Sequence, residues 1–242
     1  MVKRKFTNMN YLYILTTVSI SFGSYGQTAN DYYEAGNKLS DSKDYQNAIN
    51  SFSKSIELNP DNAKVYFSRA NAKYLNKDFK GAIDDNSKAI ELNPKYIQAY
   101  YNRGLAEHEM VDDKSAILDY TKTIELDSKY TLAYIKRANS KTVVGDFKEA
   151  IVDYSQAIKL NSHDASTYYD RANAEAKVED FKGAIQDFTK VIELTPKDGS
   201  AYVNRGLCKV KLSDGKGACS DWLKAKDLGN MDAFNLIDQF CK

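Results

Sequence analysis

The sequence predicts an all-α protein built as a solenoid of six helical hairpins, and three periodic features indicate this fold class. An aromatic-rich segment recurs every 34 residues, with its first tyrosine at positions 32, 66, 100, 134, 168 and 202. A Gly or Ala stands four residues after each of these tyrosines, and an Ala stands sixteen residues after it. A fixed period of this length is typical of stacked helical repeats, and two small residues per unit let two helices pack closely.

Residues 1–26 precede the repeats and have the pattern of a secretory signal peptide. Three basic residues at positions 3–5 come before an apolar stretch over 11–22 and a short segment of small and polar residues. We expect cleavage after Gly26 and an exported protein, either periplasmic or secreted. Retention of the segment as a membrane anchor is the alternative, although its twelve mostly apolar residues are fewer than the ~20 that span a bilayer.

The charge balance does not favour a nucleic-acid partner. The chain contains 34 Lys and Arg and 33 Asp and Glu, and three of the cations lie in residues 1–26. Residues 27–242 therefore hold 31 cations and 33 anions, a net charge of −2. A protein that binds phosphates needs a basic face or clustered Lys and Arg. We expect neither a nucleic-acid partner nor a stable membrane span after cleavage.

Each unit is predicted to form two antiparallel helices. Position 16 of every unit is Asp, which suits the N-cap of the second helix because its carboxylate accepts hydrogen bonds from the free N–H groups of the first turn. The second helix has apolar residues at helical spacing, as at Ile185, Phe188 and Ile192, and a proline follows it in three units. The six units are 29–62, 63–96, 97–130, 131–164, 165–198 and 199–232, within a repeat region of 27–232.

The pattern resembles the tetratricopeptide repeat (TPR) family over residues 29–232. The shared features are a small residue at position 8, Ala at position 20, an aromatic residue at position 24, Pro at position 32 and the period of 34. The resemblance implies a right-handed α-solenoid, and residues 233–242 are expected to form a capping helix. The second unit departs from the pattern at position 24, where Asn86 replaces the aromatic residue.

Arg at position 7 and Asp at position 23 occur together in units two to six and are both missing from unit one. Their joint absence predicts an ion pair between the two helices of one repeat, with ligand binding by the arginines as the alternative. Exposed pairs of this kind contribute about 0.2–1 kcal/mol each. The predicted structural pairs are Arg69 with Asp85, Arg103 with Asp119, Arg137 with Asp153, Arg171 with Asp187 and Arg205 with Asp221.

The resemblance also implies that a partner binds in a concave groove lined by the first helices. Aromatic residues at position 5 and asparagines at positions 6 and 9 could hold an extended peptide, since an amide side chain both donates and accepts hydrogen bonds. The alternative is that the aromatic residues only pack against the adjoining helix and the asparagines are solvated. The predicted groove residues are Tyr33, Asn37, Phe67, Asn71, Tyr101, Asn102, His108, Asn139, Tyr169 and Asn173.

Three cysteines lie near the C-terminus. In an exported chain an accessible pair is expected to oxidise, and we expect a Cys219–Cys241 disulfide because it would join the capping helix to the last repeat. A Cys208–Cys219 disulfide and free thiols remain alternatives, since the spacing does not fix the connectivity. No C-x-x-C pair is present, so neither a zinc site nor a thiol redox centre is expected.

The sequence does not indicate an enzyme. Its two histidines, His108 and His163, lie outside any nucleophile, metal or phosphate-binding motif. We expect no catalytic residues, no cofactor and no metal. The predicted function is a scaffold that binds a protein or an extended peptide after export. A carbohydrate-binding module is one alternative, because tyrosine and asparagine also suit sugar rings and hydroxyls, and a self-associating structural protein of the cell envelope is another.

Overall fold

The computed structural model describes residues 27–241, and every regular element in this range is an α-helix. Residues 1–26, the predicted signal peptide, lie outside the described residues. The thirteen helices of the described range are α1 (Ala29–Asp41), α2 (Tyr45–Leu58), α3 (Ala63–Leu75), α4 (Phe79–Leu92), α5 (Ile97–Glu109), α6 (Asp113–Leu126), α7 (Thr131–Val143), α8 (Phe147–Leu160), α9 (Ala165–Lys177), α10 (Phe181–Leu194), α11 (Gly199–Lys211), α12 (Gly215–Asp227) and α13 (Asp232–Phe240).

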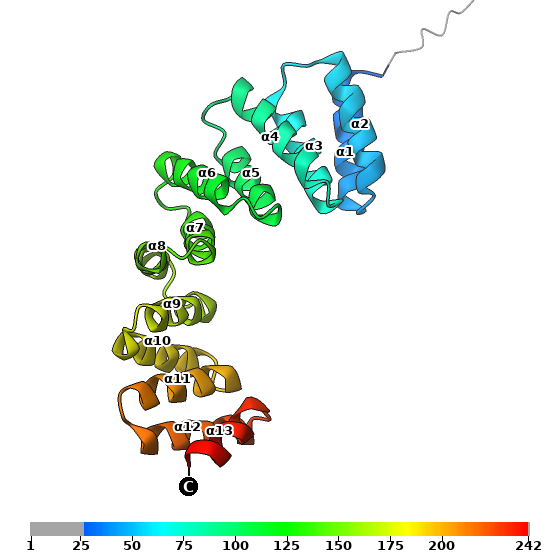
Figure 1. Ribbon diagram of the computed structural model, residues 1–242. Helices are drawn as coiled ribbons and strands as arrows, with labels where there is room; N and C mark the ends of the chain where they lie inside the picture. Colours follow the sequence, from blue (N-terminus) through cyan, green and yellow to red (C-terminus); the bar gives the residue numbers. More distant parts are fainter. Residues whose placement is uncertain (1–26, 242) are drawn as a thin grey trace, which may run out of the picture.

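The helices form a curved, elongated array in which each packs mainly on its neighbours in the sequence. Figure 1 shows α5 and α7 on the inner side of the arc and α6 and α8 on its outer side. The predicted all-α solenoid of helical hairpins is therefore confirmed. Within residues 27–241 no helix has both the length and the apolar character needed to cross a membrane.

The Asp at position 16 is the N-cap of the second helix in all six repeats. In five of them its carboxylate accepts a hydrogen bond from the backbone N–H three residues later, and Asp146 has the same place without that bond. The residue before each Asp has a positive φ, which glycine adopts most easily, yet only the fourth repeat has glycine there. These residues are Lys43, Lys77, Val111, Gly145, Glu179 and Ser213.

Small residues at position 8 make room for the large side chain at position 24. In the last repeat a Cβ added to Gly206 would lie 2.4 Å from Trp222 Nε1, so a larger residue would displace the indole. Trp222 is fully buried, and its Nε1 donates a hydrogen bond to the carbonyl of Val203 at 3.2 Å. Each repeat thus has one large buried ring at position 24 in its core, except the second repeat, where Asn86 replaces it.

Each Arg at position 7 binds the Asp at position 23 of its own repeat through two hydrogen bonds. In the fourth repeat Arg137 Nε and Nη2 donate to the two carboxylate oxygens of Asp153 at 2.8 and 2.6 Å, and the guanidinium lies over the ring of Tyr134. The other four pairs have the same geometry. The Asp side chains are only 4% to 7% exposed, so energies typical of surface ion pairs do not apply to them.

The same arginines also bind the preceding repeat, a contact that the sequence analysis missed. Nη1 of each Arg donates to a Ser or Thr hydroxyl at position 25 of the previous second helix, at 2.9 to 3.0 Å. That hydroxyl in turn donates to a carbonyl one helical turn earlier. The acceptors are Ser53, Ser87, Thr121, Ser155 and Thr189, and the sixth repeat, which no further Arg follows, has Leu223 instead. Each guanidinium therefore fixes one repeat against the next.

Position 11 places a third charged group beside each Arg–Asp pair. It is Lys in repeats two, four and six, where the ammonium lies 2.8 to 2.9 Å from the Asp carboxylate. In repeats three and five it is Glu107 and Glu175, and each leaves one buried carboxylate oxygen without a hydrogen-bond partner. Burial and the neighbouring Asp119 raise the pKa of Glu107 to about 8. Burial and Asp187 raise the pKa of Glu175 to about 7.

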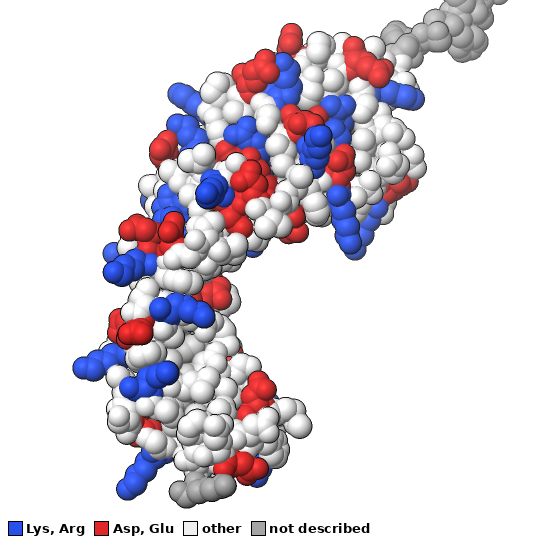
Figure 2. Space-filling view, viewed as in Figure 1, with Lys and Arg blue, Asp and Glu red and all other residues white. Residues whose placement is uncertain are grey.

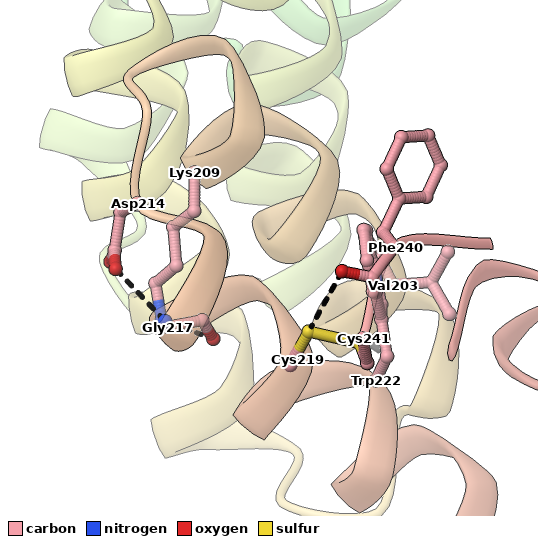
Figure 3. Close-up of a disulfide and its surroundings, with 8 residues drawn as sticks. All are labelled: Val203, Lys209, Asp214, Gly217, Cys219, Trp222, Phe240 and Cys241. Carbon is pink, nitrogen blue, oxygen red and sulfur yellow. Dashed lines mark hydrogen bonds between the residues drawn. A yellow bond between two sulfur atoms is a disulfide. The ribbon is translucent and has the colours of Figure 1, made fainter. Parts of the chain in front are cut away.

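The C-terminal helix covers the last repeat and is bound to it covalently. Helix α13 begins at Asp232, one residue before the predicted start, and a disulfide joins Cys219 of α12 to Cys241. Figure 3 shows this bridge beside Trp222 and Phe240, whose ring centroids are 5.7 Å apart. Cys208 is a buried free thiol. The cap therefore closes the apolar end of the stack over the indole.

We predict that Asp153→Ala lowers the free energy of unfolding by about 3–5 kcal/mol, because Arg137 and Lys141 would lose the buried carboxylate that neutralises them. Thr121→Ala, which removes only the contact between repeats, should cost about 1 kcal/mol. Glu193→Ala breaks an exposed pair and serves as the control, with an expected change within about 0.5 kcal/mol. Urea unfolding followed by circular dichroism measures all three, and equal effects would contradict the buried role of the pair.

We also predict that stability falls as the pH rises from about 5 to about 8. Between the ordinary carboxyl pKa and the raised pKa values of Glu107 and Glu175, the folded state holds protons that the unfolded state releases. At alkaline pH the double variant Glu107→Gln, Glu175→Gln should therefore melt about 2–4 °C above the wild type. Near pH 5 the melting temperatures of the two proteins should be close to each other. Glu109→Gln, an exposed change on α5, is the control. Parallel melting curves for the double variant and the wild type across this range would disprove the prediction.

Candidate functional site

The position-5 aromatic residues of the expected groove pack into the repeats. Tyr101 is only 8% exposed, and its ring centroid lies 5.8 Å from that of Tyr120 and 5.0 Å from that of Tyr130. Burial raises the pKa of Tyr101 to about 12. Tyr101 was predicted as a groove residue, and its ring lies in the joint between repeats three and four, as the packing alternative expects.

The other three aromatic residues at this position are partly buried and also have ring contacts. Tyr33 packs on Phe52, Phe67 on Tyr96, and Tyr169 on Phe188, with centroids 5.9, 4.9 and 5.4 Å apart. These contacts agree with the packing alternative for the ring faces. The hydroxyl of Tyr169 also accepts a hydrogen bond from Asn204 Nδ2 at 2.8 Å. These residues therefore present ring edges and polar atoms to the groove.

The asparagines predicted for the groove have different surroundings. Asn102 Nδ2 donates to Asn71 Oδ1 at 2.6 Å, which links α3 to α5. Asn139 Oδ1 accepts a hydrogen bond from the hydroxyl of Tyr154 at 2.7 Å, so that oxygen already has a partner within its repeat. Asn37 is half-buried and Asn173 is exposed. The asparagine side chains best placed to bond a ligand in the groove are therefore Asn71 of α3, Asn102 of α5 and Asn173 of α9.

His108, also predicted for the groove, has a carboxylate partner within its own repeat. Its Nδ1 lies 2.6 Å from a carboxylate oxygen of Asp113, the first residue of the second helix in the same repeat. Asp113 is nearly buried, with 4% of its side chain exposed. The histidine thus joins the two helices of the third repeat at the turn.

Three hollows open between successive first helices. One of about 230 Å³ lies between α3 and α5 and is lined by Asn71, Tyr74, Leu75, Asn86, Asn102 and Leu105. A second, of about 250 Å³, lies between α7 and α9 and includes Asn173, Lys177 and Asp170. A third, of about 560 Å³, lies between α9 and α11 and includes Tyr169, Asp170 and Asp198. These recesses lie on the first-helix face at the joints of repeats two with three, four with five, and five with six.

Asp170 is shared by the second and third hollows and was not predicted as a site residue. Burial and the nearby Asp164 raise the pKa of its carboxyl group, and Lys136 opposes this rise. Asp198, by contrast, caps α11 by accepting hydrogen bonds from two backbone N–H groups. Asp170 is therefore the carboxylate of these hollows that does not serve a helix end. The sequence gives little signal for it, because position 6 varies between repeats and is also acidic in the first repeat, as Glu34.

The charged surface is mixed in sign. Figure 2 shows Lys, Arg, Asp and Glu interspersed over the viewed face without a large region of one charge. Within the described part of the chain, no group of three or more His, Cys, Asp or Glu side chains is placed to hold a metal ion. The hollows offer hydrogen-bonding and apolar groups to a ligand, with one carboxylate at their shared edge.

Comparison with known proteins identifies the repeats. A model described as TPR repeat matches residues 36–77 and 144–179, and two models described as tetratricopeptide repeat match residues 63–96 and 165–198. The last two segments have the same bounds as the second and fifth repeats. Among curated proteins, none matches the sequence.

Solved structures of similar fold include MamA, with 23% identity over 71% of this chain and 93% of that chain and a TM-score of 0.67. YrrB, described as a TPR protein with an unusual peptide-binding site, has 22% identity over 77% and 97% of the two chains and a TM-score of 0.71. A TPR repeat-containing protein of Cytophaga hutchinsonii has 20% identity over 81% and 78% and a TM-score of 0.73. The matching segments show that the chain belongs to the tetratricopeptide repeat family, and the solved structures share its fold of stacked helical hairpins.

Proposed function

We propose that this protein is a non-enzymatic scaffold that binds an extended segment of a partner protein along the first-helix face of its solenoid. The observation that supports this proposal best is the set of three hollows between first helices, at the joints of repeats two with three, four with five, and five with six. An extended chain places alternate side chains on one side at regular intervals, so a row of recesses suits it better than a single deep cavity.

The polar groups of these hollows suit a peptide backbone. Amide side chains such as those of Asn71, Asn102 and Asn173 can donate to a carbonyl and accept from an N–H. The buried rings below them leave the recess walls rigid, which lowers the entropic cost of binding. Asp170, at the junction of two hollows, would favour a ligand segment with a basic side chain at that point.

We further propose that the protein acts after export. Two observations support this: residues 1–26 have the pattern of a signal peptide, and the cap is joined to the last repeat by a disulfide. Disulfides persist in oxidising compartments and are rare in the cytosol.

Carbohydrate binding is the second candidate. The hollow between α9 and α11 brings together the ring of Tyr169 and the carboxylates of Asp170 and Asp198, groups that also suit a sugar ring and its hydroxyls. The hydroxyl of Tyr169 already accepts a hydrogen bond from Asn204 Nδ2, which leaves it fewer bonds to offer to a sugar. This contact favours the peptide proposal.

The groove proposal predicts that changes on the first-helix face abolish partner binding. We expect the triple variant Ser166→Ala, Asp170→Ala, Asn173→Ala to recover a partner from an envelope extract at least about tenfold less efficiently than the wild type. The matched control changes three residues at position 26 of second helices, Lys122→Ala, Gln156→Ala and Lys190→Ala. Affinity capture with quantitative mass spectrometry measures recovery. Equal recovery by both variants would remove the groove proposal, and recovery of a second copy of the chain would favour self-association.

Action after export predicts two covalent features of the native protein. Protein isolated from cells should begin at Gln27, and only Cys208 should react with an alkylating reagent after unfolding without reductant. Intact-mass and peptide mass spectrometry measure both features. An intact residue 1–26 segment together with three reactive thiols would contradict export.

A further inference from the structure

The second repeat has a built-in vacancy in its core. Position 24 is a buried ring in the other five repeats, namely Phe52, Tyr120, Tyr154, Phe188 and Trp222. In the second repeat it is Asn86, which is 1% exposed and whose Oδ1 has no hydrogen-bond partner. A buried acceptor without a partner is rare in folded proteins because it loses its bonds to water and gains none in return.

Asn86 forms part of the hollow of about 230 Å³ between α3 and α5. At the outer part of this hollow, Asn102 Nδ2 donates to Asn71 Oδ1 at 2.6 Å. Within residues 27–241, the remaining amide atoms of this pair, Asn71 Nδ2 and Asn102 Oδ1, make no other side-chain hydrogen bond. Tyr74 and Leu105 supply apolar walls. The shorter side chain of Asn86 thus leaves a recess with two free acceptors, Asn86 Oδ1 and Asn102 Oδ1, and two free amide donor groups, Asn71 Nδ2 and Asn86 Nδ2.

We propose that this recess, the Asn86 pocket, accepts an uncharged carboxamide side chain, Asn or Gln, from the bound peptide segment. The assignment rests on the proposed peptide-binding function and names one specificity element within it. A carboxamide has two N–H donors and one acceptor with two lone pairs, which complement the free oxygens of Asn86 and Asn102 and the free Nδ2 groups of Asn71 and Asn86.

Charge and shape exclude other side chains. All six residues that line the Asn86 pocket are uncharged, so an ammonium or carboxylate entering it would lose its hydration without gaining an ionic partner. An aliphatic side chain would leave Asn86 Oδ1 unpartnered. The volume of the recess is several times the ~30 Å³ that one water molecule occupies in the liquid, so it has room for an amide group.

A single substitution separates a ligand pocket from a packing defect. Asn86→Phe restores the aromatic residue of the other repeats, and the fifth repeat shows that a ring fits opposite Ala at position 8, as Phe188 does opposite Ala172. Ala70 provides the same small residue in the second repeat. The variant should therefore fold and melt no lower than the wild type, while its pocket is filled.

A random peptide library displayed on phage is selected in parallel on the full chain and on Asn86→Phe, and affinities of selected peptides are then measured by calorimetry. We expect the wild type to select peptides that share an Asn or Gln at one position. Replacement of that residue by Leu or Glu should weaken binding at least about tenfold, and Asn86→Phe should weaken the parent peptide by a similar factor without lowering the melting temperature.

Two outcomes would overturn the assignment. One is a shared consensus and equal affinities for the wild type and Asn86→Phe, which would make the recess a packing defect only. The other is a consensus with a hydroxyl, charged or aliphatic residue at the position sensitive to Asn86→Phe. If the wild type selects no peptide, the proposed peptide-binding function itself fails, a result distinct from the other two.

Discussion

The array depends on the hydrogen bonds of the partly buried arginine at position 7. Its guanidinium binds the Asp of its own repeat with two hydrogen bonds and the hydroxyl of the preceding repeat with a third. A planar group with fixed donors transmits orientation, because all three bonds must be satisfied together. The angle between neighbouring hairpins is thereby fixed at five successive joints, and the curvature of the first-helix face follows from these joints.

Position 11 shows that the joints are not equivalent. Three of them hold two cations and one carboxylate, and the two with Glu107 and Glu175 hold one cation and two carboxylates. The raised pKa values of both glutamic acids mean that these joints tend to bind a proton near neutral pH. The repeats therefore share one geometry but differ in how their charge changes with pH. The 34-residue period by itself does not indicate this difference.

The candidate site arises where the pattern is broken or left unconstrained. Of the four aromatic residues predicted for the groove, Tyr101 is part of the core and the other three are partly buried in ring contacts. The recesses instead depend on Asn86, which departs from the aromatic pattern, and on Asp170, at a position that varies between repeats. Positions that the stack requires are fixed by packing, so specificity for a ligand falls to the positions that packing leaves free.

The sequence by itself determined the all-α solenoid, the six units and the caps of the second helices, because a period of 34 leaves only local contacts and contacts between neighbours to satisfy. The correlated loss of Arg and Asp from the first repeat also indicated the ion pairs seen here. Only the tertiary structure decided that Tyr101 is buried, that hydroxyls at position 25 join the repeats, and that Asn86 borders a cavity. These facts depend on which side chains meet across helices from different repeats, and spacing along one chain does not specify how deep a side chain lies between them.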